Sequence, residues 1–147
     1  MKKQGFTLIE LMVVIVIMGI LAAVAVPKLF GMIAKSKASE VGPAAGTYVH
    51  LQDSYIAEMN KTGDGTAIGY AAPASNVFGY TVTGGGDANA VWTATSNQKL
   101  NECDNGSTWT VTSSISSGAG SHDAAVNGGA NCSALTPSFT QIGAATK

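Results

Sequence analysis

The sequence contains no arginine and little charge of either sign, and these shortages exclude several function classes. Only 12% of its 147 residues are charged, and eight lysines stand against nine acidic residues for a net charge of −1. Nucleic-acid phosphates are bound by dense cationic surfaces, so no direct nucleic-acid binding is expected. Two widely spaced cysteines cannot build a metal cage alone, and they do not form a CxxC redox pair. We therefore expect no metal, no cofactor and no catalytic residues.

Long apolar runs are also scarce, with one exception at the N-terminus. Residues 6–26 carry a single charged side chain, Glu10. As a helix this run is about 32 Å long, which matches a hydrocarbon core of about 30 Å. A cleavable secretory signal that ends near Ala23-Val24-Ala25, or a plain signal anchor, would explain the hydrophobicity. Neither explains Glu10, because a carboxylate in an apolar span is costly and marks a functional residue.

The residues around Glu10 match a known processing site. Residues 3–11, KQGFTLIEL, closely resemble the cleavage site of type IV prepilins and the related pseudopilins. In that family a peptidase of the inner membrane removes a short basic leader that ends in glycine. The new N-terminal phenylalanine is N-methylated, and the glutamate four residues later is needed for filament assembly. The resemblance implies that residues 1–5 are a leader cleaved between Gly5 and Phe6, that Phe6 is methylated, and that Glu10 is the assembly carboxylate.

Simple electrostatics agrees with this assignment. Cleavage creates an ammonium group at Phe6, at the edge of an apolar layer where an unpaired charge is expensive. Glu10 could pair with that ammonium in its own chain or in a neighbouring copy. The resemblance implies the neighbour, so that Glu10 would set the register of packed helices.

Helical periodicity continues beyond the apolar run, which predicts a long helix over residues 6–60. Apolar residues recur at steps of three and four and predict a face that packs on a globular part: Val41, Ala45, Tyr48, Leu51, Tyr55 and Met59. Pro27 and Pro43 are expected to kink this helix. In the family, a glycine and a proline spaced like Gly19 and Pro27 bound a segment that loses helicity in the filament. An ordinary bent membrane helix is the alternative.

Residues 61–147 have a different character, rich in glycine, serine, threonine, alanine and asparagine. Three short runs separated by turn clusters predict strands over 77–83, 90–95 and 107–115. The expected fold class is α+β and pilin-like, in which the long kinked N-terminal helix packs against a small antiparallel sheet of three or four strands.

The segment between Cys103 and Cys132 has little to bury and is expected not to order itself by packing. A lone cysteine pair in a small exported region indicates a disulfide, and many type IV pilins have such a disulfide-bounded C-terminal region. Ser121, His122 and Asp123 have the residue types of a hydrolase triad. Neighbours in a chain do not adopt triad geometry, and they are placed in a flexible loop, so catalysis is not expected.

Together these features predict a structural subunit of a type IV pilus and not an enzyme. The implied partners are other copies of the chain in a helical filament, the prepilin peptidase and methyltransferase, and the assembly machinery of the inner membrane. The precursor would lie in that membrane, and the product would be a bacterial surface filament (fimbrium) for adhesion or motility. A major pseudopilin of type II secretion and a minor pilin remain alternatives within the family. From another class, an exported adhesin with an ordinary signal or anchor also remains.

Overall fold

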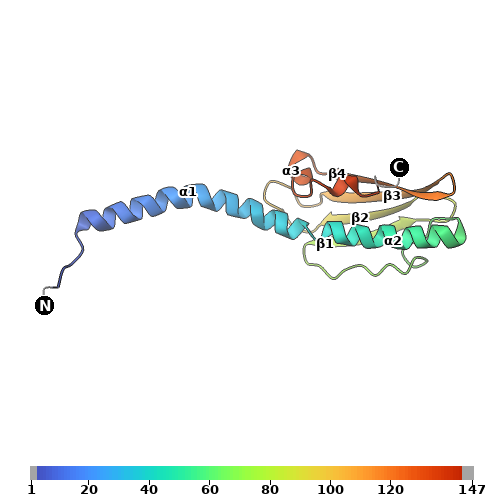
Figure 1. Ribbon diagram of the computed structural model, residues 1–147, viewed down its shortest axis with the longest axis horizontal. Coiled ribbons are helices and arrows are strands. Elements are labelled where there is room, and N and C mark those ends of the chain that lie inside the picture. Colours follow the sequence, from blue (N-terminus) through green and yellow to red (C-terminus); the bar gives the residue numbers. More distant parts are fainter. Residues whose placement is uncertain (1–2, 144–147) are drawn as a thin grey trace. The chain divides into compact units, whose positions relative to one another are not determined.

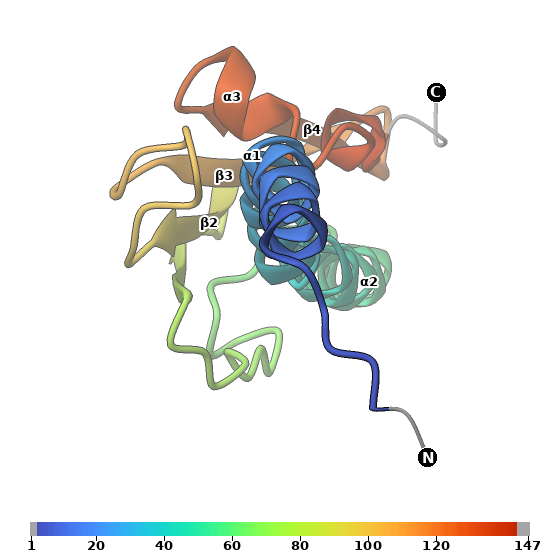
Figure 2. The same ribbon diagram turned by 90° about the vertical axis from the view of Figure 1, so that its left-hand side faces the viewer.

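The computed structural model describes residues 3–143 (Figures 1 and 2). Met1, Lys2 and residues 144–147 lie outside this range, and with them part of the expected leader and the end of the expected C-terminal region. The chain divides into two compact units, the first ending at Ile33 and the second beginning at Ala34. The second unit therefore includes the later half of the helical region as well as the strands.

Helix α1 spans Leu8–Ala38 and begins two residues later than the sequence pattern suggested. Within the first unit its large apolar side chains are exposed, from Leu8 at 80% to Ile33 at 43%. The helical region is long and apolar enough to cross a membrane, and none of its most apolar window is buried. An apolar surface of this size in contact with water is a surface for lipid or for other chains.

A short interruption at Ser39 and Glu40 separates α1 from helix α2, Val41–Met59. Pro43 lies in the first turn of α2. It has no N–H to donate to the Ser39 carbonyl, and its ring crowds that carbonyl, so it accounts for a break one turn before it. Pro27 lies inside α1, which is helical on both sides of it. A kink at Pro27 stays a prediction.

The buried face of α2 differs from the expected stripe in its second half. Val41, Ala45 and Tyr48 are buried as expected, but the next buried positions are Gln52 and Ile56. Leu51 and Tyr55 are half-buried and pack against the core, and Met59 is exposed. The expectation was wrong at Met59 and missed Gln52, because it followed apolar residue types, whereas the contact face contains a buried glutamine with hydrogen-bond partners. Asn60, in the left-handed region at φ 52°, ends the helix.

Four strands form an antiparallel sheet in the order β1-β2-β3-β4. They are β1 Phe78–Gly84, β2 Ala90–Ser96, β3 Thr108–Ser116 and β4 Ala119–Asn127. The first three match the predicted strands to within one residue at each end. Helix α2 lies along one face of the sheet (Figure 1). The α+β fold class is confirmed.

Strand β4 corrects two expectations. The region between the cysteines is not an unpacked loop, because it holds β3 and β4, which pair from Thr108↔Asn127 to Ser116↔Ala119. His122 therefore lies on a strand and not in a flexible loop. Ser117 and Gly118, at φ 53° and 82°, form the tight turn between the strands. The small side chains of β4 carry little strand propensity, so pairing with β3 and not local sequence makes this strand.

The core lies between α2 and the inner face of the sheet. Trp92 and Trp109 are fully buried there, together with Tyr48 and Phe78. Trp92 stacks on Tyr48, and Phe78 meets Trp109 edge to face, with ring centroids 6.3 and 5.2 Å apart. Residues that alternate with these along β2 and β3 are half-exposed, so the other face of the sheet meets solvent.

Cys103 and Cys132 form a disulfide, and both are buried. It joins the turn that precedes β3 to the short helix α3, Ala130–Ser133. Beyond α3, the 3-10 helix η1, Phe139–Gln141, brings Phe139 into the core against Trp92. The disulfide thus encloses the whole β3–β4 hairpin.

Candidate functional site

Glu10 and Thr7 form a reciprocal cap at the start of α1. The Thr7 backbone N–H donates to Glu10 Oε2 at 2.8 Å, and the Glu10 N–H donates to Thr7 Oγ1 at 3.3 Å. This is a capping box, in which two helix-end donors that lack helical partners are satisfied by side chains three residues apart. The carboxylate also lies where the helix dipole favours negative charge.

The cap leaves Glu10 with an unused acceptor. Within residues 3–143, Oε1 of Glu10 has no hydrogen-bond partner, and the side chain is exposed. A cationic group that approached the N-terminus of α1 would therefore find a charged acceptor already held in place by Thr7. The sequence pattern identified Glu10 but missed Thr7, although the T-x-x-E spacing is a signal for this cap.

Gly5 and Phe6 precede the helix in an extended, exposed segment. Phe6 is 85% exposed. A Cβ atom added at Gly5 would meet nothing within 4 Å, and the same holds at Gly19 inside α1. Neither glycine is required by the packing of this chain on itself. A need for glycine at Gly5 would come from a molecule that reads this segment, such as a peptidase.

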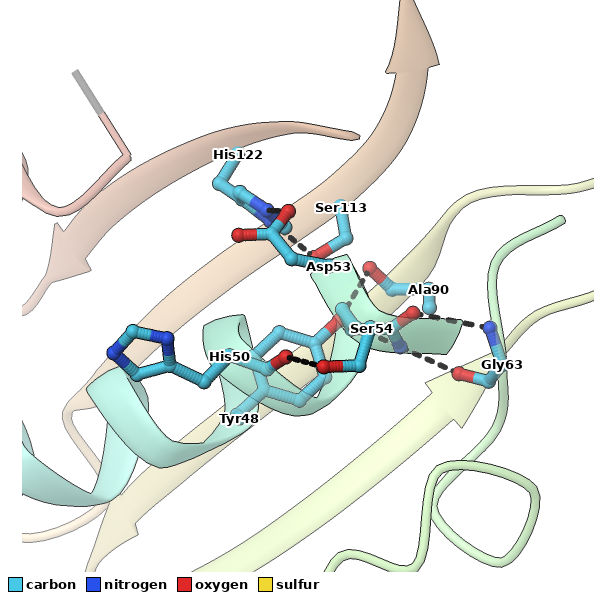
Figure 3. Close-up of polar contacts among 9 residues, drawn as sticks. Tyr48, His50, Asp53, Ser54, Gly63, Ala90, Ser113 and His122 are labelled. Atoms are coloured by element: carbon cyan, nitrogen blue, oxygen red, sulfur yellow. Dashed lines mark hydrogen bonds and ion pairs between the residues drawn. The ribbon is translucent and has the colours of Figure 1, made fainter. Parts of the chain in front are cut away.

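A second polar cluster ties α2 to the sheet (Figure 3). His122 of β4 is buried, its Nδ1 lies 2.8 Å from Ser113 Oγ of β3, and its Nε2 lies 2.8 Å from Asp53 Oδ1 of α2. The carboxylate only accepts, so a neutral ring donates from Nε2 to Asp53 and accepts at Nδ1 from the Ser113 hydroxyl. The structure thus builds a Ser-His-Asp chain, but from Ser113 and Asp53 and not from the sequence neighbours of His122.

This chain has the residue types of a hydrolase triad in a different arrangement. In a catalytic triad the serine contacts Nε2 and the aspartate contacts Nδ1, whereas here the two nitrogens are exchanged. Ser113 is fully buried, so a substrate has no access to its hydroxyl. The cluster acts as a tie between α2 and the β3–β4 hairpin.

Gln52 and Tyr48 extend the polar contacts of the same helix. The Gln52 side-chain amide donates to the Gly63 carbonyl, and its oxygen accepts from the Gly63 N–H at 3.0 Å. The Tyr48 hydroxyl donates to the Ala90 carbonyl at 3.1 Å. Burial raises the pKa of Tyr48 above its ordinary value, so the hydroxyl stays protonated as a donor. The sequence analysis did not find these contacts, because nothing local marks Gln52 as buried.

Comparison with known proteins shows which proteins the chain resembles. Residues 1–26 match the prokaryotic N-terminal methylation motif. The chain is 40% identical over 83 residues to the type IV major pilin protein PilA of Myxococcus xanthus, an alignment that covers 56% of this chain and 38% of the relative. It is 40% identical over 96 residues to the type IV major pilin protein PilE1 of Neisseria gonorrhoeae, which covers 65% and 53%.

A third relative is the fimbrial protein of Dichelobacter nodosus, 44% identical over 83 residues, which covers 56% of this chain and 48% of the relative. The matched motif and the names of these relatives support a type IV pilin. The chain spans about half the length or less of these three pilins. The residues that carried the resemblance, Gly5, Phe6 and Glu10, all lie inside the matched motif.

The contacts of His122 give a direct test of stability. Replacing His122 by leucine keeps a side chain of similar bulk but removes both of its hydrogen bonds, to Ser113 and to Asp53. We expect the free energy of unfolding to fall by about 1–3 kcal/mol, measured by urea unfolding of the full chain in detergent with tryptophan fluorescence.

The other histidine serves as the matched control for this test. His50 is exposed on α2, the helix that also carries Asp53. His50→Gln should therefore leave the unfolding midpoint unchanged. If His122→Leu were as stable as the wild type, the contacts to Ser113 and Asp53 would not hold α2 on the sheet.

Proposed function

We propose that this protein is a structural subunit of a type IV pilus. A precursor held in the inner membrane by the first half of α1 is cleaved after Gly5, N-methylated at Phe6 and added to a surface filament. One observation carries the proposal: a long apolar helix with no buried face within the first unit starts just after a Gly-Phe junction and has in its first turn the glutamate that caps it. The names of the relatives, major pilins and a fimbrial protein, support the same role.

The first half of α1 suits two successive environments. The 31 residues of the whole helix α1 extend for about 46 Å at 1.5 Å per residue, which is more than the bilayer core of about 30 Å. In the filament the same side chains would pack against copies of themselves. Lipid tails are already apolar, so transfer into a helix bundle gains little from the hydrophobic effect, and close packing and polar pairs supply the specificity.

Glu10 would supply the polar pair. In the precursor its carboxylate caps α1 through Thr7. After cleavage the Phe6 ammonium lies one residue before Thr7, and an unpaired ammonium in an apolar bundle is expensive. The second carboxylate oxygen of Glu10 can accept a hydrogen bond from the Phe6 ammonium of a neighbouring copy. The carboxylate would then cap its own helix and fix the register of the next one.

Gly19 and Pro27 remain candidates for a change on assembly. The structure has a continuous helix over both residues. Pro27 leaves the Ala23 carbonyl without its helical N–H donor, and glycine has a weak helix preference. Both residues lower the cost of unwinding the segment between them, so we propose that this segment loses helicity in the filament.

The intact mass and N-terminal peptide of the protein from its own cells test the proposal. We expect a chain that begins at Phe6 with one added methyl group, recovered from sheared surface filaments in which it is the main subunit. Retention of Met1 would contradict the processing step. A new N-terminus near Val26 would indicate an ordinary secretory signal and a surface domain of another class.

A further inference from the structure

The second unit has a hollow on its surface. This hollow lies between β1 and the segment that joins α2 to β1, which runs beside the sheet in Figure 2. Its volume is about 420 Å³, and it is lined by Asp64, Gly65, Thr66, Tyr70, Ala72, Tyr80 and Val82. This volume lies in the range of small-molecule sites, and the lining combines two aromatic rings with a carboxylate and a hydroxyl.

Both tyrosines are held in place from behind. The Tyr70 hydroxyl accepts a hydrogen bond from Nε1 of the buried Trp92 at 2.8 Å. The Tyr80 hydroxyl donates to Glu40 Oε1 at 2.7 Å, and its ring lies 5.7 Å from that of Trp92. Both side chains are half-buried. The rings are therefore preorganised, and a ligand that packs on them would order little additional structure.

The backbone of the joining segment is fixed as well. The Ile68 N–H donates to the Asp64 carbonyl at 3.1 Å, and the Tyr70 N–H donates to the Gly65 carbonyl at 2.8 Å. Thr62 is paired with Gly86 of the β1–β2 connection. These bonds hold the rim of the hollow against β1.

The rim retains free hydrogen-bonding groups. Asp64 Oδ1 accepts from the Ala67 N–H at 2.8 Å, which orients the carboxylate. Among residues 3–143, Oδ2 of Asp64 and the exposed Thr66 hydroxyl have no hydrogen-bond partner. The hollow thus presents a charged acceptor and a hydroxyl beside two aromatic rings.

We propose that this hollow binds one ring of a neutral oligosaccharide. A pyranose ring has a face of C–H groups that packs on aromatic side chains and a rim of hydroxyl donors that a carboxylate accepts. A purely apolar ligand would bury the free oxygen of Asp64 without a partner, which is unfavourable. An acidic sugar would be repelled by Asp64 and by Glu40 behind Tyr80. This binding would be a property of the single subunit, independent of assembly.

The decisive variant fills the hollow without disturbing its supports. Ala72 lines the hollow and is exposed, so Ala72→Trp should occupy the space of the ligand. Ala74 is exposed in the same segment but is not part of the lining, so Ala74→Trp is the matched control. Asp64→Asn keeps an oxygen for the Ala67 N–H and removes only the charge.

Binding is measured by calorimetric titration of the full chain in a detergent without sugar head groups. The probes are cellopentaose, maltopentaose and tetra-N-acetylchitotetraose as neutral sugars, tetragalacturonic acid as the acidic one, and tetramethylammonium as a cation. We expect at least one neutral sugar to bind and tetragalacturonic acid not to bind. Ala72→Trp should weaken binding by at least about tenfold and Asp64→Asn by about tenfold, as for loss of a hydrogen bond to a charged acceptor. Ala74→Trp should bind like the wild type.

Three outcomes would overturn the assignment. The first is that no neutral probe binds at concentrations up to about 10 mM. The second is binding that Ala72→Trp leaves unchanged, which would place the sugar elsewhere on the chain. The third is binding of tetramethylammonium alone, which would make the hollow a cation site. None of these outcomes bears on the proposed role in a filament.

Discussion

Cells that express the Glu10→Leu variant are expected to assemble no filaments, although the precursor is made and inserted. The physical reason is the charge at Phe6. An apolar bundle that lacks the carboxylate would have to hold an unpaired ammonium for every subunit, and breaking a buried charge pair costs about 3–5 kcal/mol. Repeated at each added copy, this cost would stop polymerisation. The measurement is the amount of sheared surface protein and the filaments seen by electron microscopy.

The capping box makes it necessary to separate two roles of Glu10. Glu10→Leu removes both the cap on Thr7 and the charge. Glu10→Gln keeps an oxygen that can accept from the Thr7 N–H and removes only the charge. Loss of a cap costs about 1 kcal/mol, which would weaken the first turn of α1 without preventing assembly. If the charge pair is the essential role, Glu10→Gln assembles no filaments, just as Glu10→Leu assembles none.

Thr7→Val is the complementary variant, because it removes the hydroxyl that accepts from the Glu10 N–H and leaves the charge. We expect it to assemble. Equal amounts of precursor in the membrane are the control for all three variants. Filaments at wild-type levels from Glu10→Leu would end the pairing model. Filaments from Glu10→Gln together with none from Glu10→Leu would show that the cap is the essential role.

Replacing Cys103 and Cys132 together by alanine is expected to lower the free energy of unfolding by about 3–4 kcal/mol. The cross-link closes a long loop in the unfolded chain, with a sequence separation of 29, and its removal restores the entropy of that loop. The consequence is large because this loop contains β3 and β4, the most extensively paired strands of the sheet. Urea unfolding of the full chain in detergent measures the effect.

The control for the cysteine variant is a reductant. Reduced wild type should unfold at the midpoint of the double variant, and the double variant itself should not respond to reductant. Two results together would contradict the disulfide. The cysteines of the wild type would react with an alkylating agent before reduction, and the reductant would leave the stability of the wild type unchanged.

The N-terminal features were available from the sequence because they are local. The Gly5-Phe6 junction, Glu10 and the apolar run of residues 6–26 depend on residue type and spacing along a single helix. The first three strands could also be predicted, since threonine, valine and aromatic residues alternate within each of them. In all these cases neighbours in the chain are neighbours in the structure.

The missed features depend on residues that are distant in the sequence. Strand β4 has small side chains and becomes a strand by pairing with β3. His122 contacts Asp53, which is 69 residues away in the sequence. Gln52 is buried because the backbone of Gly63 forms hydrogen bonds with both ends of its side-chain amide. Local propensity carries no record of such partners, which exist only once the helix lies on the sheet.

The sequence by itself thus predicted a type IV pilin, an assembly helix and a processing site, because these features are read along the chain. Tertiary structure alone decided what holds the second unit together and which surface it offers to a ligand. Tyr70 and Tyr80 are ten residues apart in the chain and line one hollow because Trp92 and Glu40 fix their hydroxyls. A binding surface arises from the convergence of separate segments, and that convergence is a property of the folded chain.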